Sequence, residues 1–293
     1  MWCSCFRAVG ILKKYLSLVK FSHTIFALPF ALIGFTFAVT RPNTSFDYKL
    51  LLLVLLCMVF ARNAAMGFNR WADAKIDGKN PRTAVREIPA GKISSTSALL
   101  FVALNCLAFI ACTVFINPLC LLLSVPFLAV ILGYSYTKRF TSLSHFVLGF
   151  GLALAPYGAY LTVRPEWNTT MFFVSLLVFT WVSGFDIIYA CQDEQFDKDN
   201  QLFSIPSYLG IKRALLVSTI THVFTALLVV VLGLYQQFGF MYWIGAVLFI
   251  LLLVYQHYLV KPTDLSKVNL AFFTTNGLGS VVFALCFIVE ILT

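Results

Sequence analysis

Apolar residues run along this chain in long blocks that short polar segments separate. A membrane-spanning helix needs about 20 consecutive, mostly apolar residues. Nine blocks of roughly this kind occur, at residues 23–40, 50–70, 97–116, 119–136, 144–163, 170–190, 213–234, 240–260 and 269–291. Several breaks carry turn chemistry, such as Asn117-Pro118 and Lys261-Pro262. The pattern predicts an all-α, polytopic membrane protein with nine transmembrane helices.

The composition supports lipid as the solvent of this chain. Of its 293 residues, 60% are hydrophobic and 11% are charged, and the mean hydropathy is +0.88. A soluble domain is about a quarter charged, so this chain has too few charges to cover a surface in water. The first twenty residues lack an apolar core before a small-residue cleavage site, so we expect no cleavable signal peptide. The eight cysteines lack ligand-like spacing and suggest a reducing compartment, with acylation as an alternative for Cys3 and Cys5.

The distribution of basic residues predicts the orientation. If the N-terminus is cytoplasmic, inside segments hold 17 of the 21 Lys and Arg residues, and outside loops hold Arg41, Lys49 and Arg164. This bias follows the positive-inside rule. It also accounts for the net charge of +9, so we predict no nucleic-acid partner. We expect a multi-pass protein of the inner (plasma) membrane, with the mitochondrial inner membrane as the alternative.

The chain is predicted to be a single membrane-embedded domain, residues 1–293. It would comprise a cytoplasmic N-terminal segment (1–20) and two cytoplasmic cap loops (71–96 and 191–212). Each cap loop opens with two aspartates four residues apart, followed by Ile-Pro and a glycine. These residues are Asp73, Asp77, Ile88, Pro89 and Gly91 in the first loop, and Asp193, Asp197, Ile205, Pro206 and Gly210 in the second. The offset of 120 residues predicts a parallel repeat of two four-helix units plus one helix.

Polar residues continue from each cap loop into the helix before it. They are Arg62, Asn69, Asp73 and Asp77 in the first half, and Asp186, Asp193 and Asp197 in the second, with Tyr189 close by. Steps of seven and four residues place each set on one helical face. An Arg or Asp at the bilayer centre costs about 2.5–3.5 kcal/mol on insertion scales, so these residues predict a wet cavity. One such motif alone is most often a solvated last turn, but two at matching positions predict a functional site.

Carboxylates four residues apart on one helical face converge on a hard cation. Mg²⁺ is commonly held by one or two carboxylates together with substrate phosphates, so two facing helices of this kind would hold one diphosphate. Lys138 and Arg139 would contact the remaining phosphate oxygens, with orientation signalling as an equal alternative. Lys212 and Arg213 fit a membrane anchor better. No phosphate loop or nucleophile–base pair accompanies the motifs, and packing roles are expected for the four histidines.

Two stretches of the chain match the motifs of a known family. Residues 69–77 (NRWADAKID) match N-x-x-x-D-x-x-x-D, and residues 189–197 (YACQDEQFD) match Y-A-x-x-D-x-x-x-D. Residues 80–91 and 22–30 resemble the family's loop between spans 2 and 3 and the region near its first span. In these features the chain resembles the UbiA superfamily of intramembrane aromatic prenyltransferases. Many members have Asp where this chain has Arg70, which leaves the number of metal ions open.

The resemblance implies nine helices around a central cavity that the cap loops cover. It implies Mg²⁺-dependent transfer of a polyprenyl chain from polyprenyl diphosphate to an aromatic acid. The 4-hydroxybenzoate branch, in ubiquinone biosynthesis, matches best; the alternatives are a dihydroxynaphthoate, in menaquinone biosynthesis, or haem. The implied metal ligands are Asn69, Asp73, Asp77, Asp193 and Asp197. The other implied site residues are Asp186 for catalysis, and Arg62, Lys138, Arg139 and Tyr189 for substrate binding.

Arg62 is the candidate that binds the carboxylate of the acceptor, because a guanidinium fork matches that group. Asp186 would orient the phenol hydroxyl or join the metal site, and the prenyl tail would run toward lipid. Two functions outside the family are rivals. A CDP-alcohol phosphotransferase would need a D-G-x-x-A-R core, which the sequence lacks, and a cation-coupled transporter would place its carboxylates near mid-membrane. No obligatory protein partner is predicted.

Overall fold

A computed structural model describes residues 14–19 and 26–293 of the chain. Within these residues the regular structure is helical, apart from one isolated bridge between Lys261 and Asp264. The all-α prediction is thereby confirmed. The expectations for Cys3, Cys5 and His23 lie outside the described residues.

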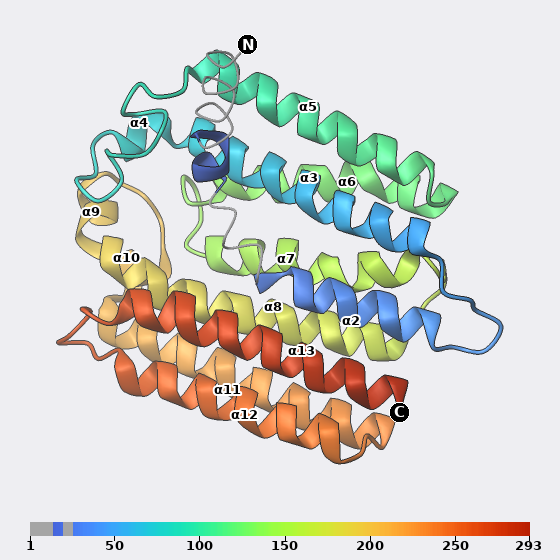
Figure 1. Ribbon diagram of the computed structural model, residues 1–293. Coiled ribbons are helices and arrows are strands. Elements are labelled where there is room, and N and C mark those ends of the chain that lie inside the picture. Colours follow the sequence, from blue (N-terminus) through green and yellow to red (C-terminus); the bar gives the residue numbers. More distant parts are fainter. Residues whose placement is uncertain (1–13, 20–25) are drawn as a thin grey trace, which may run out of the picture.

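The long helices run side by side, and short elements gather at one end of them (Figure 1). The long helices are α2 (Leu28–Val39), α3 (Tyr48–Ala72), α5 (Ser95–Val114), α6 (Pro118–Thr137), α7 (Ser144–Leu161), α8 (Thr169–Ala190), α11 (Ile211–Gln236), α12 (Phe240–Leu259) and α13 (Asn276–Leu292). The short elements are α4 (Ala74–Asp77), the 3-10 turn η2 (Cys191–Asp193), α9 (Glu194–Asp199), α10 (Ile205–Leu209) and the π-helix η3 (Leu270–Thr275).

Seven helices in the described part of the chain are long and apolar enough to cross a membrane. They are Tyr48–Ala72, Ser95–Val114, Pro118–Thr137, Thr169–Asp199, Ile211–Gln236, Phe240–Leu259 and Leu270–Leu292. The chain is therefore a polytopic membrane protein. The two other predicted spans coincide with α2 (12 residues) and α7 (18 residues), which are not among the seven. Nine crossings and a cytoplasmic N-terminus stay predictions.

Polar caps determine where several of these helices begin. Asp47, Ser94, Asn117 and Asn168 each accept a hydrogen bond from a backbone N–H of the first turn. Such bonds satisfy donors that every helix start leaves open. Pro118 then occupies the first position of α6, where no N–H is needed. The polar breaks between apolar blocks therefore act as helix starts.

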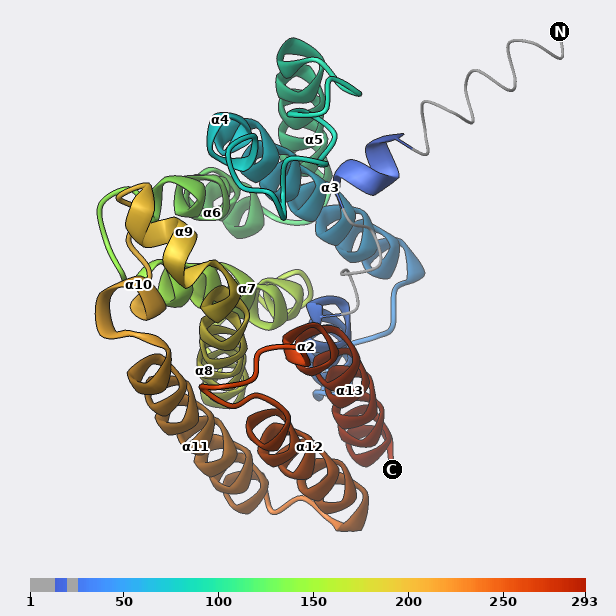
Figure 2. The same ribbon diagram turned by 90° about the vertical axis from the view of Figure 1, so that its left-hand side faces the viewer.

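The long helices form two groups on either side of α2 (Figure 2). We call α3, α5, α6 and α7 the first bundle, and α8, α11, α12 and α13 the second bundle. α7 packs along α8 where the bundles meet, and α2 packs against α7 and α13. The boundary between the bundles falls between α7 and α8, and the repeat of two four-helix units plus one helix stays a prediction.

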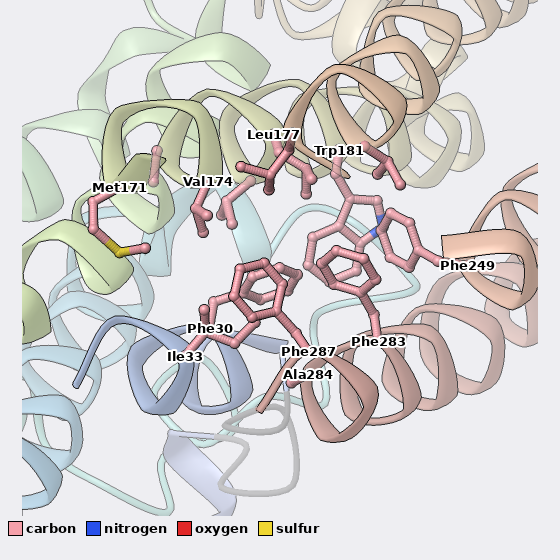
Figure 3. Packing of buried hydrophobic residues seen from close by; sticks show 14 of the residues in the cluster. Phe30, Ile33, Met171, Val174, Leu177, Trp181, Phe249, Phe283, Ala284 and Phe287 are labelled. Carbon is pink, nitrogen blue, oxygen red and sulfur yellow. The ribbon is translucent and has the colours of Figure 1, made fainter. Parts of the chain in front are cut away.

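The interior of the second bundle is filled by aromatic side chains. Trp181, Phe249, Phe283 and Phe287 point into this interior (Figure 3). Together with Tyr242 they are at most 2% exposed. The Trp181 and Phe249 ring centroids are 5.6 Å apart, and Trp181 Nε1 donates a hydrogen bond to Asn276 Oδ1 at 3.1 Å. Each aromatic pair at such a separation contributes about 0.5–1.5 kcal/mol beyond burial. The second bundle is thus closely packed.

The interior of the first bundle instead holds an apolar cavity of about 410 Å³. All four of its helices line this cavity. Representative lining residues are Val54, Met58 and Ala61 of α3, Phe109 of α5, Phe127 of α6 and Gly158 of α7. Val54, Met58 and Arg62 are spaced four residues apart, so the cavity continues the helical face that carries Arg62.

Candidate functional site

Both acidic motifs lie where a long helix ends, at the same end of the molecule (Figure 1). α3 ends at Ala72, Asp73 is its C-cap, and the short helix α4 carries Asp77. α8 ends at Ala190, and a 3-10 turn carries Asp193. A turn at Asp73 and a 3-10 turn at Cys191–Asp193 thus interrupt the α-helical geometry within the motifs, while backbone hydrogen bonds four residues apart continue from Asn69 to Asp77. Asp is a poor residue for a helix interior, and the first Asp of each motif lies in such an interruption, at Asp73 after α3 and at the end of the turn Cys191–Asp193 after α8.

The buried side chain of Asp73 is paired with two partly exposed cations. Lys138 Nζ is 2.7 Å from Asp73 Oδ2, and Arg139 Nη2 is 3.6 Å from Asp73 Oδ1. Asn69 Nδ2 donates a hydrogen bond to Asp73 Oδ2 at 3.3 Å. Lys138 and Arg139 directly follow α6, so the end of α6 supplies the positive charge that balances Asp73. These four predicted site residues lie together.

Asp77 is held by the first cap loop. Arg86 Nη1 lies 2.6 Å and 2.7 Å from the two Asp77 carboxylate oxygens. The hydroxyl of Thr83 donates to the backbone carbonyl of Asp77 at 3.1 Å. From the sequence, Arg86 was expected only to contribute to membrane orientation. Arg86 comes nine residues after Asp77, and Pro81 between them ends the helix. This short separation was the one feature of the sequence that could have indicated the pair.

Asp193 is bound by residues of the first cap loop, which connects the two motifs. Arg82 pairs with both Asp193 carboxylate oxygens, and Asn80 Nδ2 donates to Oδ1 at 3.1 Å. Arg82 Nη1 also donates to the Tyr189 hydroxyl at 3.1 Å. Burial is the largest single influence on the pKa of Arg82 and lowers it, but the hydrogen bonds and negative charge of Asp193, together with Tyr189, outweigh burial and the pKa is raised. The two predicted motifs therefore meet through Arg82 and Asn80, which the sequence analysis did not assign to the site.

Asp197 is held within the second cap loop. The hydroxyl of Ser204, the N-cap of α10, donates to Asp197 Oδ2 at 2.8 Å. The backbone N–H of Phe203 donates to the Lys138 carbonyl at 2.7 Å. The second cap loop therefore contacts the segment that carries the cations of Asp73.

A second group of polar residues lies deeper between the bundles. Tyr134 of α6 is within electrostatic range of Asp73, Asp186, Arg62 and Arg70. Tyr134 is thus near both the acidic end and the residues predicted to bind an acceptor.

Asp186 has a partner that the sequence pattern did not predict. His145 Nδ1 lies 2.7 Å from Asp186 Oδ2, although packing was expected for this histidine. His145 and Asp186 are 41 residues apart, so no local spacing could have revealed the pair.

Comparison with known proteins identifies the family of this chain. A profile of the UbiA prenyltransferase family matches residues 27–278. The chain belongs to the UbiA prenyltransferase family. This UbiA-family chain is therefore an enzyme that transfers prenyl groups, as the motifs predicted.

Individual relatives of this UbiA-family protein cover most of its length. The 4-hydroxybenzoate octaprenyltransferase of Tolumonas auensis is 30% identical over 81% of this chain and 83% of the relative. The enzyme of the same name from Francisella tularensis SCHU S4 is 26% identical over 94% of this chain and 97% of the relative. A solved UbiA homolog from Aeropyrum pernix is 28% identical, with a TM-score of 0.79 over 92% of this chain and 97% of that one. A UbiA homolog from Archaeoglobus fulgidus, bound to GPP and Mg²⁺, shares the fold with a TM-score of 0.74 at 21% identity, over 96% of this chain and 100% of that one.

The acidic residues of this UbiA-family site fit a Mg²⁺ ion that phosphate oxygens help to bind. Across residues 14–19 and 26–293, no three His, Cys, Asp or Glu side chains converge on one point. Mg²⁺ needs only one or two carboxylates when water and substrate phosphates complete its shell. The buried Asp73 Oδ1 accepts no hydrogen bond from any described residue, so this oxygen has a lone pair to offer. The ligand roles of Asn69, Asp73, Asp77, Asp193 and Asp197 stay predictions.

Proposed function

We propose that this enzyme transfers a polyprenyl chain from polyprenyl diphosphate to an aromatic acid, with Mg²⁺ bound, in ubiquinone or menaquinone biosynthesis. We take 4-hydroxybenzoate as the acceptor. The observation that carries the proposal is that Asn80 and Arg82, which follow the first acidic motif, bind Asp193 of the second motif. The two motifs and their cations therefore lie together. The names of the relatives support the acceptor, and the GPP- and Mg²⁺-bound homolog supports the donor and the metal.

The acidic end would bind the diphosphate. Asn69, Asp73, Asp77, Asp193 and Asp197 would hold Mg²⁺, which when bound supplies positive charge to the leaving diphosphate. Lys138 and Arg86 already lie within ion-pair distance of these acids. They would donate to phosphate oxygens, where negative charge grows as the allylic C–O bond breaks.

The deeper polar group would bind the acceptor. Arg62 would hold its carboxylate, and Asp186 would accept a hydrogen bond from its phenol hydroxyl. The electron pair of the breaking C–O bond leaves with the diphosphate, and a pair from the ring carbon ortho to the hydroxyl forms the new C–C bond. That carbon then loses its proton to Asp186, which restores the aromatic ring.

The cavity of the first bundle would take part of the prenyl chain. It is apolar, and it lies beyond Arg62 along the face of α3 that leads from Asp73. A chain whose diphosphate is held at Asp73 would therefore reach it by following this face. We expect the enzyme to lie in the inner membrane with its cap loops in the cytoplasm, and it needs no protein partner in this scheme.

The test is transfer by the purified protein in detergent. Labelled polyprenyl diphosphate is offered with 4-hydroxybenzoate, a dihydroxynaphthoate or haem, with and without Mg²⁺. We expect labelled 4-hydroxybenzoate only with Mg²⁺, and no transfer by Asp73→Asn or Asp193→Asn. Near-normal transfer by both variants would refute the site. Release of CMP from a CDP-alcohol, or cation uptake into liposomes without prenyl transfer, would support the rival functions.

A matched experiment tests the acceptor role of Arg62. A hydrogen-bonded charge contributes about 1.5–3 kcal/mol, so Arg62→Ala should raise the KM for 4-hydroxybenzoate about 10–100-fold. The KM for polyprenyl diphosphate should change much less. Equal effects on both substrates would assign Arg62 a different role.

A further inference from the structure

A buried histidine connects the two ends of the site. His145 is the second residue of α7 and is 4% exposed. Its Nδ1 lies 2.7 Å from Asp186 Oδ2, and its Nε2 lies 3.4 Å from the backbone nitrogen of Ile205. Ile205 is the first residue of α10, in the second cap loop.

These contacts determine where the proton of the imidazole lies. The Ile205 N–H can only donate, so Nε2 must offer its lone pair, and the hydrogen of a neutral imidazole is on Nδ1. Nδ1–H then donates to Asp186, whose carboxylate can only accept when ionised. A doubly protonated imidazole would point Nε2–H at the Ile205 N–H. The contacts therefore assign Nδ1–H as the donor to Asp186 and Nε2 as the acceptor from the Ile205 N–H.

The same contacts connect Asp186 to the metal-binding end. Ser204 immediately precedes Ile205, caps α10 and donates to Asp197 Oδ2 at 2.8 Å. One route of hydrogen bonds and backbone thus runs from Asp186 through His145 to Asp197. Asp186 is the more accessible member of the pair, with 21% of its side chain exposed against 5% for His145. The carboxylate, not the imidazole, is therefore available to a substrate.

We propose that His145 is a positioning residue that holds Asp186 against the phenol of the acceptor. Through its hydrogen bond to Ile205, it also fixes the position of this carboxylate relative to the second cap loop. This inference rests on the proposed function, because it needs Asp186 to act on an aromatic acceptor. It assigns His145 no contact with either substrate. Removing His145 should therefore slow the acceptor step and leave binding of the diphosphate largely intact.

Three substitutions separate positioning from packing. His145→Leu removes both hydrogen bonds and fills similar space, His145→Asn keeps an N–H donor near the position of Nδ1, and His257→Asn alters a histidine that contacts His222 and Thr219 instead. Misplacement of a reacting group costs about 10²-fold. We expect His145→Leu to lower kcat for 4-hydroxybenzoate about 10²-fold, with less than about threefold change in the KM for polyprenyl diphosphate. The kcat of His145→Asn should be at least about tenfold higher than that of His145→Leu. The kcat of His257→Asn should equal that of the wild type.

The outcomes distinguish this inference from the proposed function. If the wild type transfers prenyl groups and His145→Leu keeps its kcat, or if Asn fails to restore it, the inference on His145 is wrong while the proposed function stands. If the wild type transfers nothing to any aromatic acid, the proposed function itself fails. The ¹⁵N NMR spectrum of histidine-labelled enzyme is a second measurement that does not depend on turnover. We expect the signal that disappears in His145→Asn to be that of a neutral Nδ1–H imidazole, and an imidazolium or Nε2–H signal would overturn the assignment.

Discussion

The two bundles carry matching acidic motifs, yet their interiors differ. The second bundle is filled around Trp181, which is fully buried, whereas the first holds a partly open apolar cavity of about 410 Å³. Protein interiors are normally packed without voids, because each empty volume forfeits contacts. The difference indicates that the second bundle is a closely packed support, and that the first bundle provides the space in which a substrate binds.

The acidic residues of the two motifs also differ, both in their exposure and in the half of the chain that supplies their cations. The Asp73 and Asp77 side chains are 2% and 6% exposed, and cations of the first half bind both. The Asp193 side chain is 19% exposed, and its cation, Arg82, comes from the opposite half. The first half therefore supplies the positive charge for both motifs.

The largest expected effect tests the contrast in packing. Trp181→Ala should lower the free energy of unfolding by about 3–5 kcal/mol, because neighbours in a filled core cannot collapse into the space. Phe127→Ala, beside the cavity, should cost less than half as much. The measurement is denaturant unfolding of both variants in the same micelles. Equal losses would show that the first bundle is packed as closely as the second.

A smaller effect tests the contrast in charge. Arg86→Met leaves the buried Asp77 carboxylate without its cation and should cost about 3 kcal/mol. Arg82→Met unpairs the more exposed Asp193 and should cost about 1 kcal/mol, because solvent screens it. Unfolding in detergent again measures both. The reverse order would mean that the motif of the second bundle is the more deeply buried charge.

A third change fills the cavity itself. A Cβ added at Gly158 meets no described atom within 4 Å, whereas one at Gly245 of the second bundle lies 2.6 Å from Cys286 Cβ. Gly158→Leu should therefore change stability by less than about 1 kcal/mol, and Gly245→Leu should cost about 1–3 kcal/mol by overpacking. We expect Gly158→Leu to lower kcat/KM for octaprenyl diphosphate about tenfold relative to geranyl diphosphate. Unchanged chain-length preference would remove the cavity from the substrate path.

The smallest effect concerns a helix cap. Ser204→Ala removes the N-cap of α10 and should cost about 1 kcal/mol. Ser94 is the N-cap of α5, and its side chain contacts no acidic side chain within the described residues. Ser94→Ala should lower the free energy of unfolding by about the same amount as Ser204→Ala. Because Ser204 also binds Asp197, only Ser204→Ala should weaken the activation of transfer by Mg²⁺. Equal Mg²⁺ dependence in the two variants would separate Asp197 from the metal site.

The sequence predicted the features that depend on local pattern. Long apolar blocks predicted the helical membrane fold, and the motifs at Asp73 and Asp193 predicted which helix ends meet, because both follow from periodicity and topology. The breaks at the two motifs were not predicted, since polar spacing alone cannot distinguish a continued helix from a capped one.

The partners of the acids were harder to predict because they depend on how distant segments pack. Arg82 and Asp193 are 111 residues apart, and His145 and Asp186 are 41 residues apart. In a sequence, an arginine in a loop near a membrane is sufficiently explained by its effect on orientation. A buried histidine is likewise sufficiently explained by packing. Only the folded chain shows that each has a carboxylate partner.

The central claim is that Asp73 and Asp193 act on one diphosphate, and a double-mutant cycle tests it most directly. The measurement is Mg²⁺-dependent binding of an unreactive prenyl thiodiphosphate to the wild type, Asp73→Asn, Asp193→Asn and the double variant. If both acids serve one ion-bridged headgroup, each single change should weaken binding strongly, and the double variant should lose at least about 1 kcal/mol less than the sum of the two. Strictly additive losses, or wild-type affinity in either single variant, would contradict the account.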